Sequence, residues 1–158
     1  AGEDGRWADA TLGSGLGKQS ADFTGFGAAA LDIDRDGLPE LAVVNGRVLR
    51  AAGVEEDDHW SPYAEANQLF WNEGSGRFRQ AGGECGALCG VGVSRGLASG
   101  DVDNDGDADL LMSSADGRVQ LFRNVWPSDA HWVGVSLFDP RGPRDAPGAR
   151  VEIRAGSR

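Results

Sequence analysis

The apolar residues of this chain gather in short runs that polar residues interrupt. One run covers residues 41–44 and ends at Asn45 and Gly46, and another covers residues 110–112 and ends at Ser113 and Ser114. Runs of this length are short for a helix, and turn-forming residues bound them as they bound buried strands. We therefore predict one strand at each run.

A second pair of related segments follows the two runs. Residues 67–72 read Asn-Gln-Leu-Phe-Trp-Asn, and residues 119–124 read Val-Gln-Leu-Phe-Arg-Asn. The first segment continues through Glu-Gly-Ser-Gly at 73–76 into residues 77–80. Two short apolar segments joined by a glycine-rich turn are typical of a β-hairpin. We predict a hairpin over residues 67–80.

These segments form part of an internal repeat. Small residues at 25–31 precede the first run, and residues 95–100 precede the second, in units offset by 69 positions. Each unit reads as four short strands, and repeats of this kind are typical of β-propeller blades. Small side chains would suit crowded innermost strands, and aromatic side chains would pack between blades: Ala28, Ala29, Ala30, Ala98 and Ser99, then Phe70, Trp71, Phe78 and Phe122. We predict an all-β fold with two propeller-type blades that form an incomplete ring.

The pattern changes after Trp126. Residues 131–137 alternate, with Val133, Val135 and Leu137 on one face, and residues 151–154 alternate again. Alternation of this kind predicts strands. We therefore expect two domains: residues 1–126, which hold the two blades, and residues 127–158, which begin a second β domain. Since two blades cannot close a ring of about four to eight, we expect the chain to be a fragment of a longer protein.

An acidic loop directly precedes each apolar run. Residues 32–40 read Asp-Ile-Asp-Arg-Asp-Gly-Leu-Pro-Glu, and residues 101–109 read Asp-Val-Asp-Asn-Asp-Gly-Asp-Ala-Asp. Carboxylates at positions 1, 3 and 5 can converge when the backbone wraps round one point, and the glycine at position 6 permits that turn. Ca²⁺ prefers about six to eight oxygen ligands. The predicted ligands are the carboxylates of positions 1, 3, 5 and 9 and the carbonyl of position 7: Asp32, Asp34, Asp36, Leu38 and Glu40, then Asp101, Asp103, Asp105, Asp107 and Asp109.

These loops differ from an EF-hand. That loop needs a bidentate Glu at position 12 and flanking helices, whereas Val43 and Met112 stand at position 12 here and strands are expected on both sides. Metal-free turns rich in Asp and Gly are the alternative for each loop, but two matching copies favour calcium. Without a cation, the clustered carboxylates would repel one another. We therefore expect two Ca²⁺ ions and a fold that calcium stabilises.

Composition narrows the classes of partner. Acidic residues number 25 against 15 basic ones, for a net charge of −10, which disfavours nucleic acid and anionic membranes as partners. No apolar stretch approaches the roughly 20 residues that span a bilayer. The two cysteines, Cys85 and Cys89, either form a local disulfide or remain as buried thiols. A disulfide would suit an oxidising compartment.

The chain resembles the FG-GAP/VCBS repeat followed by an ASPIC/UnbV domain, the arrangement of cartilage acidic protein-like proteins. The resemblance rests on residues 96–111, on the Asn-x-Leu-Phe-x-Asn motif at 67–72 with its looser copy at 119–124, and on residues 131–135 and 148–151. It implies a secreted β-propeller with calcium in the acidic loops and a role in cell adhesion or protein interaction. Pro39 and Glu40 depart from the repeat pattern and make the first site the less regular one.

Function is therefore expected to be non-catalytic: a calcium-binding, extracellular or periplasmic module that binds a protein or glycan, or the missing blades of a longer chain. His-Glu-x-x-His does not occur in the sequence. Two alternatives remain: an accessory repeat region of a secreted hydrolase or lyase, and a carbohydrate-binding module with exposed indole rings as platforms. The candidate rings are Trp60, Trp71, Trp126 and Trp132.

Overall fold

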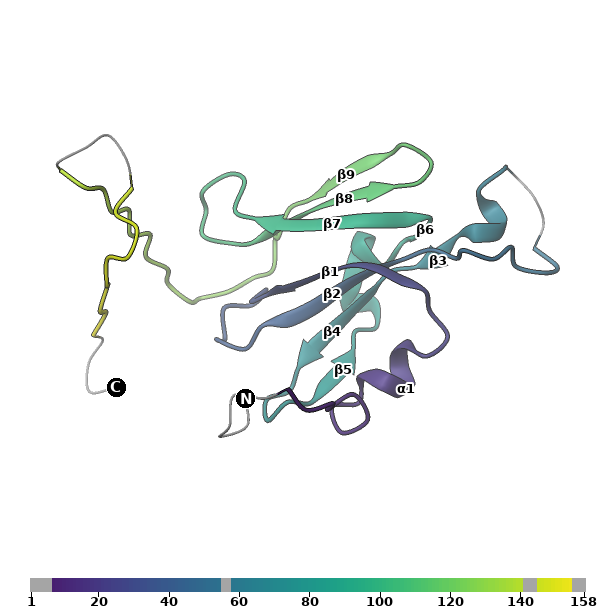
Figure 1. The fold of residues 1–158 in the computed structure, drawn as a ribbon, viewed down its shortest axis with the longest axis horizontal. Coiled ribbons are helices and arrows are strands. Elements are labelled where there is room, and N and C mark those ends of the chain that lie inside the picture. Colours follow the sequence, from purple (N-terminus) through teal and green to yellow (C-terminus); the bar gives the residue numbers. More distant parts are fainter. Residues whose placement is uncertain (1–6, 55–57, 141–144, 155–158) are drawn as a thin grey trace.

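Two antiparallel β-sheets dominate the computed structural model, which describes residues 7–54, 58–140 and 145–154 (Figure 1). The predicted all-β class is confirmed. The first sheet has the order β1-β2-β4-β5, the second has the order β7-β8-β9, and β3 pairs with β6. The strands are β1 Gly25–Leu31, β2 Glu40–Asn45, β3 Glu65–Ala66, β4 Gln68–Asn72, β5 Phe78–Gln80, β6 Val91–Gly92, β7 Ser94–Gly100, β8 Asp109–Ser114 and β9 Val119–Phe122.

The two sheets repeat the same register. Leu31 pairs with Glu40 in the first sheet, and Gly100 pairs with Asp109 in the second. Both long hairpins also carry a register shift at the same place, between Gly25 and Gly27 in β1 and between Ser94 and Gly96 in β7. The 69-residue offset of the sequence is therefore an offset between structurally equivalent backbone positions.

Each sheet has two faces because successive side chains alternate. Face A of the first sheet carries Ala42, Leu69 and Trp71, and its face B carries Leu41, Val43 and Phe70. The equivalent face A of the second sheet carries Leu111, Val119 and Leu121, and its face B carries Leu110, Met112 and Phe122. The buried core joins face A of the first sheet to face B of the second.

The first strands of the two sheets approach each other closely. A Cβ atom on Gly27 would lie only 2.7 Å from the backbone nitrogen of Leu97 and 2.9 Å from its Cβ. Strands β1 and β7 run side by side in the same region (Figure 1). The absence of a side chain at Gly27 therefore permits the close contact between the sheets.

Helical segments are short, and the strand pattern did not predict the first of them. Helix α1 Leu16–Ser20 lies against face B of the first sheet, and η1 Ser61–Tyr63 and η2 Gly83–Cys89 are 3-10 segments. Gln19 attaches α1 to the sheet: its carbonyl accepts from Gln68 Nε2 at 2.8 Å, and its Oε1 accepts from the Gln80 N–H at 2.6 Å. Within the described ranges, no helix is long and apolar enough to cross a membrane.

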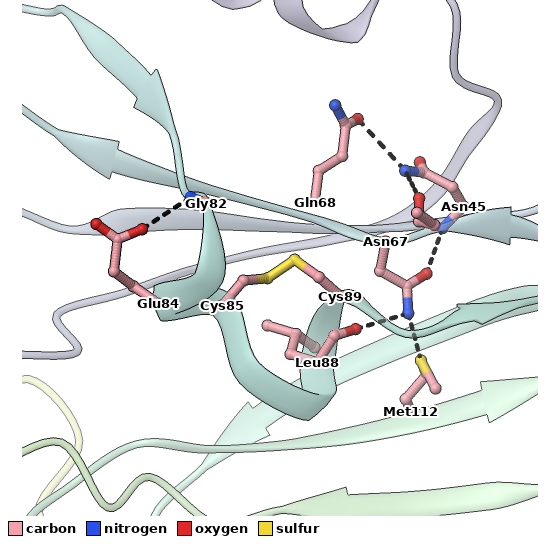
Figure 2. Close-up of a disulfide and its surroundings, with 10 residues drawn as sticks. Asn45, Asn67, Gln68, Gly82, Glu84, Cys85, Leu88, Cys89 and Met112 are labelled. Carbon is pink, nitrogen blue, oxygen red and sulfur yellow. Dashed lines mark hydrogen bonds between the residues drawn. A yellow bond between two sulfur atoms is a disulfide. The ribbon is translucent and has the colours of Figure 1, made fainter.

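A disulfide and a buried amide strengthen the junction between the sheets (Figure 2). Cys85 and Cys89 form the disulfide in η2, so the free-thiol alternative does not apply. Asn67 Nδ2 donates to the Leu88 carbonyl at 3.0 Å and contacts Met112 Sδ at 3.3 Å, while Asn67 Oδ1 accepts from the Asn45 N–H. One side chain thus links the first sheet, the disulfide segment and β8.

The second sheet departs from the predicted four-strand unit. It has three strands, and no counterpart of β5 follows β9 in the described residues. In the first unit, Gly74 and Gly76 adopt positive φ angles and return the chain into β5. The second unit continues instead through Val125, Trp126 and Pro127, which offer no glycine turn. The absence of turn chemistry explains the missing fourth strand.

The predicted strands at 131–137 and 151–154 are wrong. Both segments lack strand pairing, and the bridge between Phe138 and Asp145 is isolated. Val133 and Val135 stay exposed, at 67% and 53%. An alternating pattern needs a partner strand and a surface to cover, and the described part of the chain supplies neither here (Figure 1). The 127–158 domain includes residues 141–144 and 155–158, which lie outside the described residues, and its boundary stays a prediction.

Candidate metal centre

The two acidic loops connect equivalent strands and share one backbone conformation. The first joins β1 to β2 and the second joins β7 to β8. At position 6, Gly37 and Gly106 both have φ of 89°, as expected for a glycine that permits a sharp turn. At position 4, Arg35 and Asn104 also have positive φ, at 62° and 60°. Asparagine is among the residues that favour this conformation, whereas arginine rarely adopts it, so the sequence gave a signal for position 4 only in the second loop.

Three carboxylates converge in each loop. In the first loop, one oxygen each from Asp32, Asp34 and Glu40 lies within 4.8 Å of the others. In the second loop, Asp101, Asp103 and Asp109 do the same. These are positions 1, 3 and 9 of the predicted ligand sets. Carboxylate oxygens are the hard donors that Ca²⁺ prefers, so the chemistry of both clusters fits that ion.

The position-1 carboxylates are held by the turn itself. Asp32 Oδ1 accepts from the Asp36 N–H at 3.0 Å, and its Oδ2 accepts from the Gly37 N–H at 2.9 Å. Asp101 makes the same two bonds with the N–H groups of Asp105 and Gly106, at 3.2 and 3.0 Å. These bonds offset part of the cost of gathering negative charge without a cation.

Positions 5 and 7 lie outside the clusters. Asp36 Oδ1 accepts from the Leu38 N–H at 2.7 Å, and Asp105 Oδ1 accepts from the Asp107 N–H at 3.0 Å. The carboxylates of Asp36 and Asp105 are exposed and do not join the cluster of their loop. Leu38 is 37% exposed. Ligation by the position-5 carboxylates and by the carbonyls of position 7 stays a prediction.

The position-9 carboxylates are buried and accept hydrogen bonds from backbone N–H groups. Glu40 is 1% exposed and Asp109 is 2% exposed. Glu40 Oε2 accepts from the Ile33 N–H at 2.9 Å, and Asp109 Oδ1 accepts from the Asn124 N–H at 2.8 Å. Burial raises the pKa of Glu40, while the N–H bond from Ile33 opposes that rise. The desolvated carboxylate would gain a counter-charge from a bound cation.

A basic residue distinguishes the second loop from the first. Arg123 Nη2 contacts the Asp103 carboxylate and lies 3.5 Å from Asp105 Oδ2. The aligned position in the first repeat is Trp71, since β4 and β9 share their register with β2 and β8. Among the described residues, a guanidinium group therefore contacts a cluster carboxylate in the second loop only. The spacing of the acids did not predict this contact.

Arg35 joins the two loops to each other. Its Nη2 lies 2.5 Å from Asp107 Oδ1 and 3.4 Å from the Asp105 carbonyl. Asn124, which follows β9, donates through Nδ2 to the Ile33 carbonyl of the first loop at 2.9 Å. The sequence placed the loops in separate units, but tertiary packing brings them into direct contact.

The indole rings occupy different environments. Trp71 is 9% exposed and packs against Trp126, with ring centroids 4.9 Å apart beside a cavity of about 450 Å³. Trp60 is half-buried and contacts His59 edge-on. Trp132 is 52% exposed, and its ring covers Gly106 so closely that a Cβ there would overlap it. Burial of Trp71 counts against its use as a sugar platform.

Comparison with known families finds one match, to an FG-GAP-like repeat over residues 56–112. The matched segment runs from the residues before η1 to the middle of β8 and contains the second acidic loop. The first loop precedes it. Neither the curated proteins nor the solved structures include a match to this chain.

Proposed function

We propose that this chain is a calcium-stabilised, non-catalytic repeat module of extracellular type that acts in adhesion or protein interaction. The FG-GAP-like repeat at residues 56–112 and the disulfide between Cys85 and Cys89 support that environment. The two carboxylate clusters support the metal. The proposal extends to both loops because the first repeats the geometry of the loop that lies inside the family match.

One observation carries the calcium proposal: the chain builds the same cluster twice, at positions 1, 3 and 9 of both loops. Two unit charges about 4.8 Å apart repel by about 3 kcal/mol at an effective dielectric near 20. Gathering three carboxylates therefore costs free energy in each loop. The attraction of a divalent cation for each carboxylate would outweigh this repulsion. The cation would stabilise the folded chain because unfolded loops cannot hold it.

Different residues would supply the ligands on the two sides of the ion. Asp34 and Asp103, at position 3, accept fewer backbone bonds than their neighbours at position 1. They would present oxygens for coordination, in Asp103 after the ion displaces Arg123. Glu40 and Asp109 would supply the oxygens on the sheet side. When bound, the cation would fix the geometry of each β-hairpin end, so that the exposed loop surface is presented to a partner in one conformation.

Calcium titration by calorimetry tests the proposal on the chelator-stripped chain. The variants Asp34→Asn and Asp103→Asn each remove one charge from one cluster, and Asp22→Asn removes an exposed charge remote from both loops in sequence. We expect about two ions per wild-type chain, loss or strong weakening of one site in each cluster variant, and no change in Asp22→Asn. If all four folded proteins gave the same titration, the proposal would be wrong and both loops would be ordinary metal-free turns.

The remaining expectations extend the same proposal. Residues 127–158 would belong to an ASPIC/UnbV-type domain, and the two sheets would serve as propeller blades. The ladder β1-β2-β4-β5 supports the second point, since consecutive neighbouring strands are how a blade is built.

A further inference from the structure

The chain that follows β9 runs between the two acidic loops (Figure 1). Residues 128–132 of this segment, which we call the clasp, are attached to the first loop by two hydrogen bonds. Ser128 Oγ donates to the Asp34 carbonyl at 2.8 Å, and Arg35 Nη1 donates to the Ala130 carbonyl at 3.2 Å. The Ser128 hydroxyl also accepts from the Ala130 N–H at 3.2 Å, which closes a local turn. The clasp is therefore attached at positions 3 and 4 of the first loop, beside a predicted ligand.

The second loop receives an aromatic ring from the clasp. Trp132 lies on Gly106, where the absence of a side chain permits the contact. The Gly106 N–H donates to Asp101 Oδ2 at 3.0 Å, so the ring lies beside a hydrogen bond that holds the position-1 carboxylate. In the first loop, Gly37 has the same φ of 89° and makes the same bond to Asp32, but a Cβ there would meet no atom within 4 Å. The chain thus contains the same hydrogen bond with and without an aromatic cover.

Asn124 directs the chain from β9 onto the loops. Its backbone N–H donates to Asp109 Oδ1 at 2.8 Å, and its Nδ2 donates to the Ile33 carbonyl at 2.9 Å. Its Oδ1 accepts from the Trp126 N–H at 3.0 Å, which turns the chain toward the clasp. One residue thus attaches the start of the segment to both loops, as the clasp does further along.

The clasp supports the loops without using the oxygens that would coordinate an ion. Ser128 binds the Asp34 carbonyl, and Trp132 covers the backbone of Gly106. Neither contact uses a carboxylate oxygen of the two clusters. Arg123 differs, because its guanidinium contacts a cluster carboxylate and would compete with the ion. The clasp therefore fixes the loop backbone and leaves both clusters open to a cation.

We propose that the clasp is a positioning element of the candidate metal centre: Ser128 fastens the first loop, and Trp132 fastens the second, in the conformation that brings their carboxylates together. Docking of the clasp and binding of an ion strengthen each other, because both require the same loop conformation and linkage is reciprocal. Ion occupancy thereby also sets the direction in which residues 133–140 leave the repeats. The coupling to ions rests on the calcium binding proposed above, whereas the fastening of the loops does not.

Amide hydrogen exchange, followed by NMR on the full chain in chelator, tests the fastening of the second loop. Gly37 and Gly106 form a matched pair, because both follow an aspartate and donate to a position-1 carboxylate, and only Gly106 is covered. In the wild-type chain we expect the Gly106 amide to exchange at least about fivefold more slowly than that of Gly37. Trp132→Ala should remove this difference. Trp132→Phe, which keeps a ring, and Val133→Ala, which changes the exposed neighbouring residue, should retain it. A Gly106 exchange rate that Trp132→Ala leaves unchanged would overturn the fastening.

Calorimetric calcium titration tests the coupling to ions, one site at a time. Trp132→Ala is titrated in the Asp34→Asn background, which retains the second site, and Ser128→Ala is titrated in the Asp103→Asn background, which retains the first. We expect each clasp variant to lower the affinity of the retained site by about fivefold or more. Ser136→Ala, an exposed serine outside the clasp, should change neither affinity. Circular dichroism verifies that each variant is folded.

The outcomes distinguish the clasp from the calcium function. If the wild-type chain binds calcium at both loops and neither Trp132→Ala nor Ser128→Ala changes an affinity, the coupling is wrong and the calcium function stands. If the folded wild-type chain binds no calcium, the calcium function and the coupling are both wrong. The exchange rate of the Gly106 amide then still decides whether the clasp fastens its loop.

Discussion

The two acidic loops have the same backbone conformation but different charged neighbours. Arg123 contacts Asp103 and Asp105 in the second loop, whereas the aligned residue of the first repeat, Trp71 in β4, is uncharged and buried. An exposed ion pair of this kind is worth about 0.2–1 kcal/mol. Calcium would have to displace the guanidinium from the second site, so the two loops should differ in affinity although their ligand positions are the same.

Replacing Arg123 should therefore strengthen the second site. We expect Arg123→Gln to raise the calcium affinity of that site by up to about fivefold and to leave the first site unchanged, as measured by calorimetric titration in the Asp34→Asn background. Arg118→Gln is the matched control, because Arg118 pairs with Asp116 in the turn between β8 and β9. Equal gains in both variants would indicate a general charge effect and would contradict a local role for Arg123.

Glu40 should give the calcium-free chain a distinctive pH dependence. Burial raises its pKa above the usual 4.5, so the folded chain holds this proton more tightly than the unfolded chain does. The stabilisation that results is complete below about pH 4.5 and is lost as the pH rises through the folded-state pKa. Glu40→Gln lacks this proton equilibrium.

Urea unfolding in chelator checks that expectation. The free energy of unfolding of the wild-type chain, relative to Glu40→Gln, should fall as the pH rises from 4.5 toward neutrality and then level off. The comparison uses the pH slopes of the free energy of unfolding and not its absolute values. Glu40 accepts hydrogen bonds from two backbone N–H groups, and the NH₂ group of a glutamine would face one of these donors. Parallel curves at all pH values would mean that Glu40 is not desolvated in the calcium-free chain.

Part of the site follows from sequence at this scale and part does not. The spacing predicted that the carboxylates of positions 1, 3, 5 and 9 converge, and those of positions 1, 3 and 9 do so whereas those of position 5 lie outside the clusters. The contacts of Arg35 and Arg123 arise from packing between units, and no local pattern encodes them. The left-handed conformation of Arg35 is likewise imposed by the loop against the preference of the residue.

The disulfide segment η2 should contribute measurably to stability. Closing so short a loop in the unfolded chain is worth about 2 kcal/mol in the chain-entropy account. Cys85 and Leu88 are also buried, at 6% and 8% exposure, beside Asn67. We expect Cys85→Ala/Cys89→Ala to lower the free energy of unfolding by about 2 kcal/mol or slightly more in urea melts.

Reducing agent supplies the control for that measurement. The wild-type chain should lose a similar amount of stability in excess reductant, and the double variant should be insensitive to it. Stability that reductant does not change in the wild-type chain would show that the cross-link adds nothing to the packing of η2.

The elements were predicted well where local and tertiary signals agree. Strands β2, β4 and β8 coincide with the predicted runs, because each run is bounded by turn residues and covers a core face. Residues 131–137 carry an equally good alternating pattern but find no partner strand in the described structure. Alternation specifies which faces a strand would have, whereas pairing depends on a neighbour that one segment cannot encode.

The contact between the two sheets should be sensitive to a single methyl group. Gly27→Ala would place a Cβ within 3.0 Å of Leu97 and Val44, so we expect a loss of about 1–3 kcal/mol in the free energy of unfolding. Gly96→Ala is the matched control at the equivalent position, where the Cβ would chiefly meet the flexible Ser113 hydroxyl. Equal losses for the two variants in thermal or urea unfolding would contradict a specific crossing of β1 and β7.

The packing of the two sheets against each other was harder to predict from the sequence. The 69-residue offset predicted that the two units are equivalent, and their registers confirm it. It could not predict that face A of one unit meets face B of the other, because both faces carry apolar residues. That choice is made by the close approach at Gly27 and by the polar bridge through Asn67 to Met112.

Arg35 gives the molecule a property that neither loop has alone. It belongs to the first loop by sequence but holds Asp107 and the Asp105 carbonyl of the second. An ion that alters the position of Arg35 therefore changes the free energy of the other loop, and thermodynamic linkage makes the influence equal in both directions. When both loops hold a cation, as proposed, occupancy of either loop would change the affinity of the other across the boundary between the repeats.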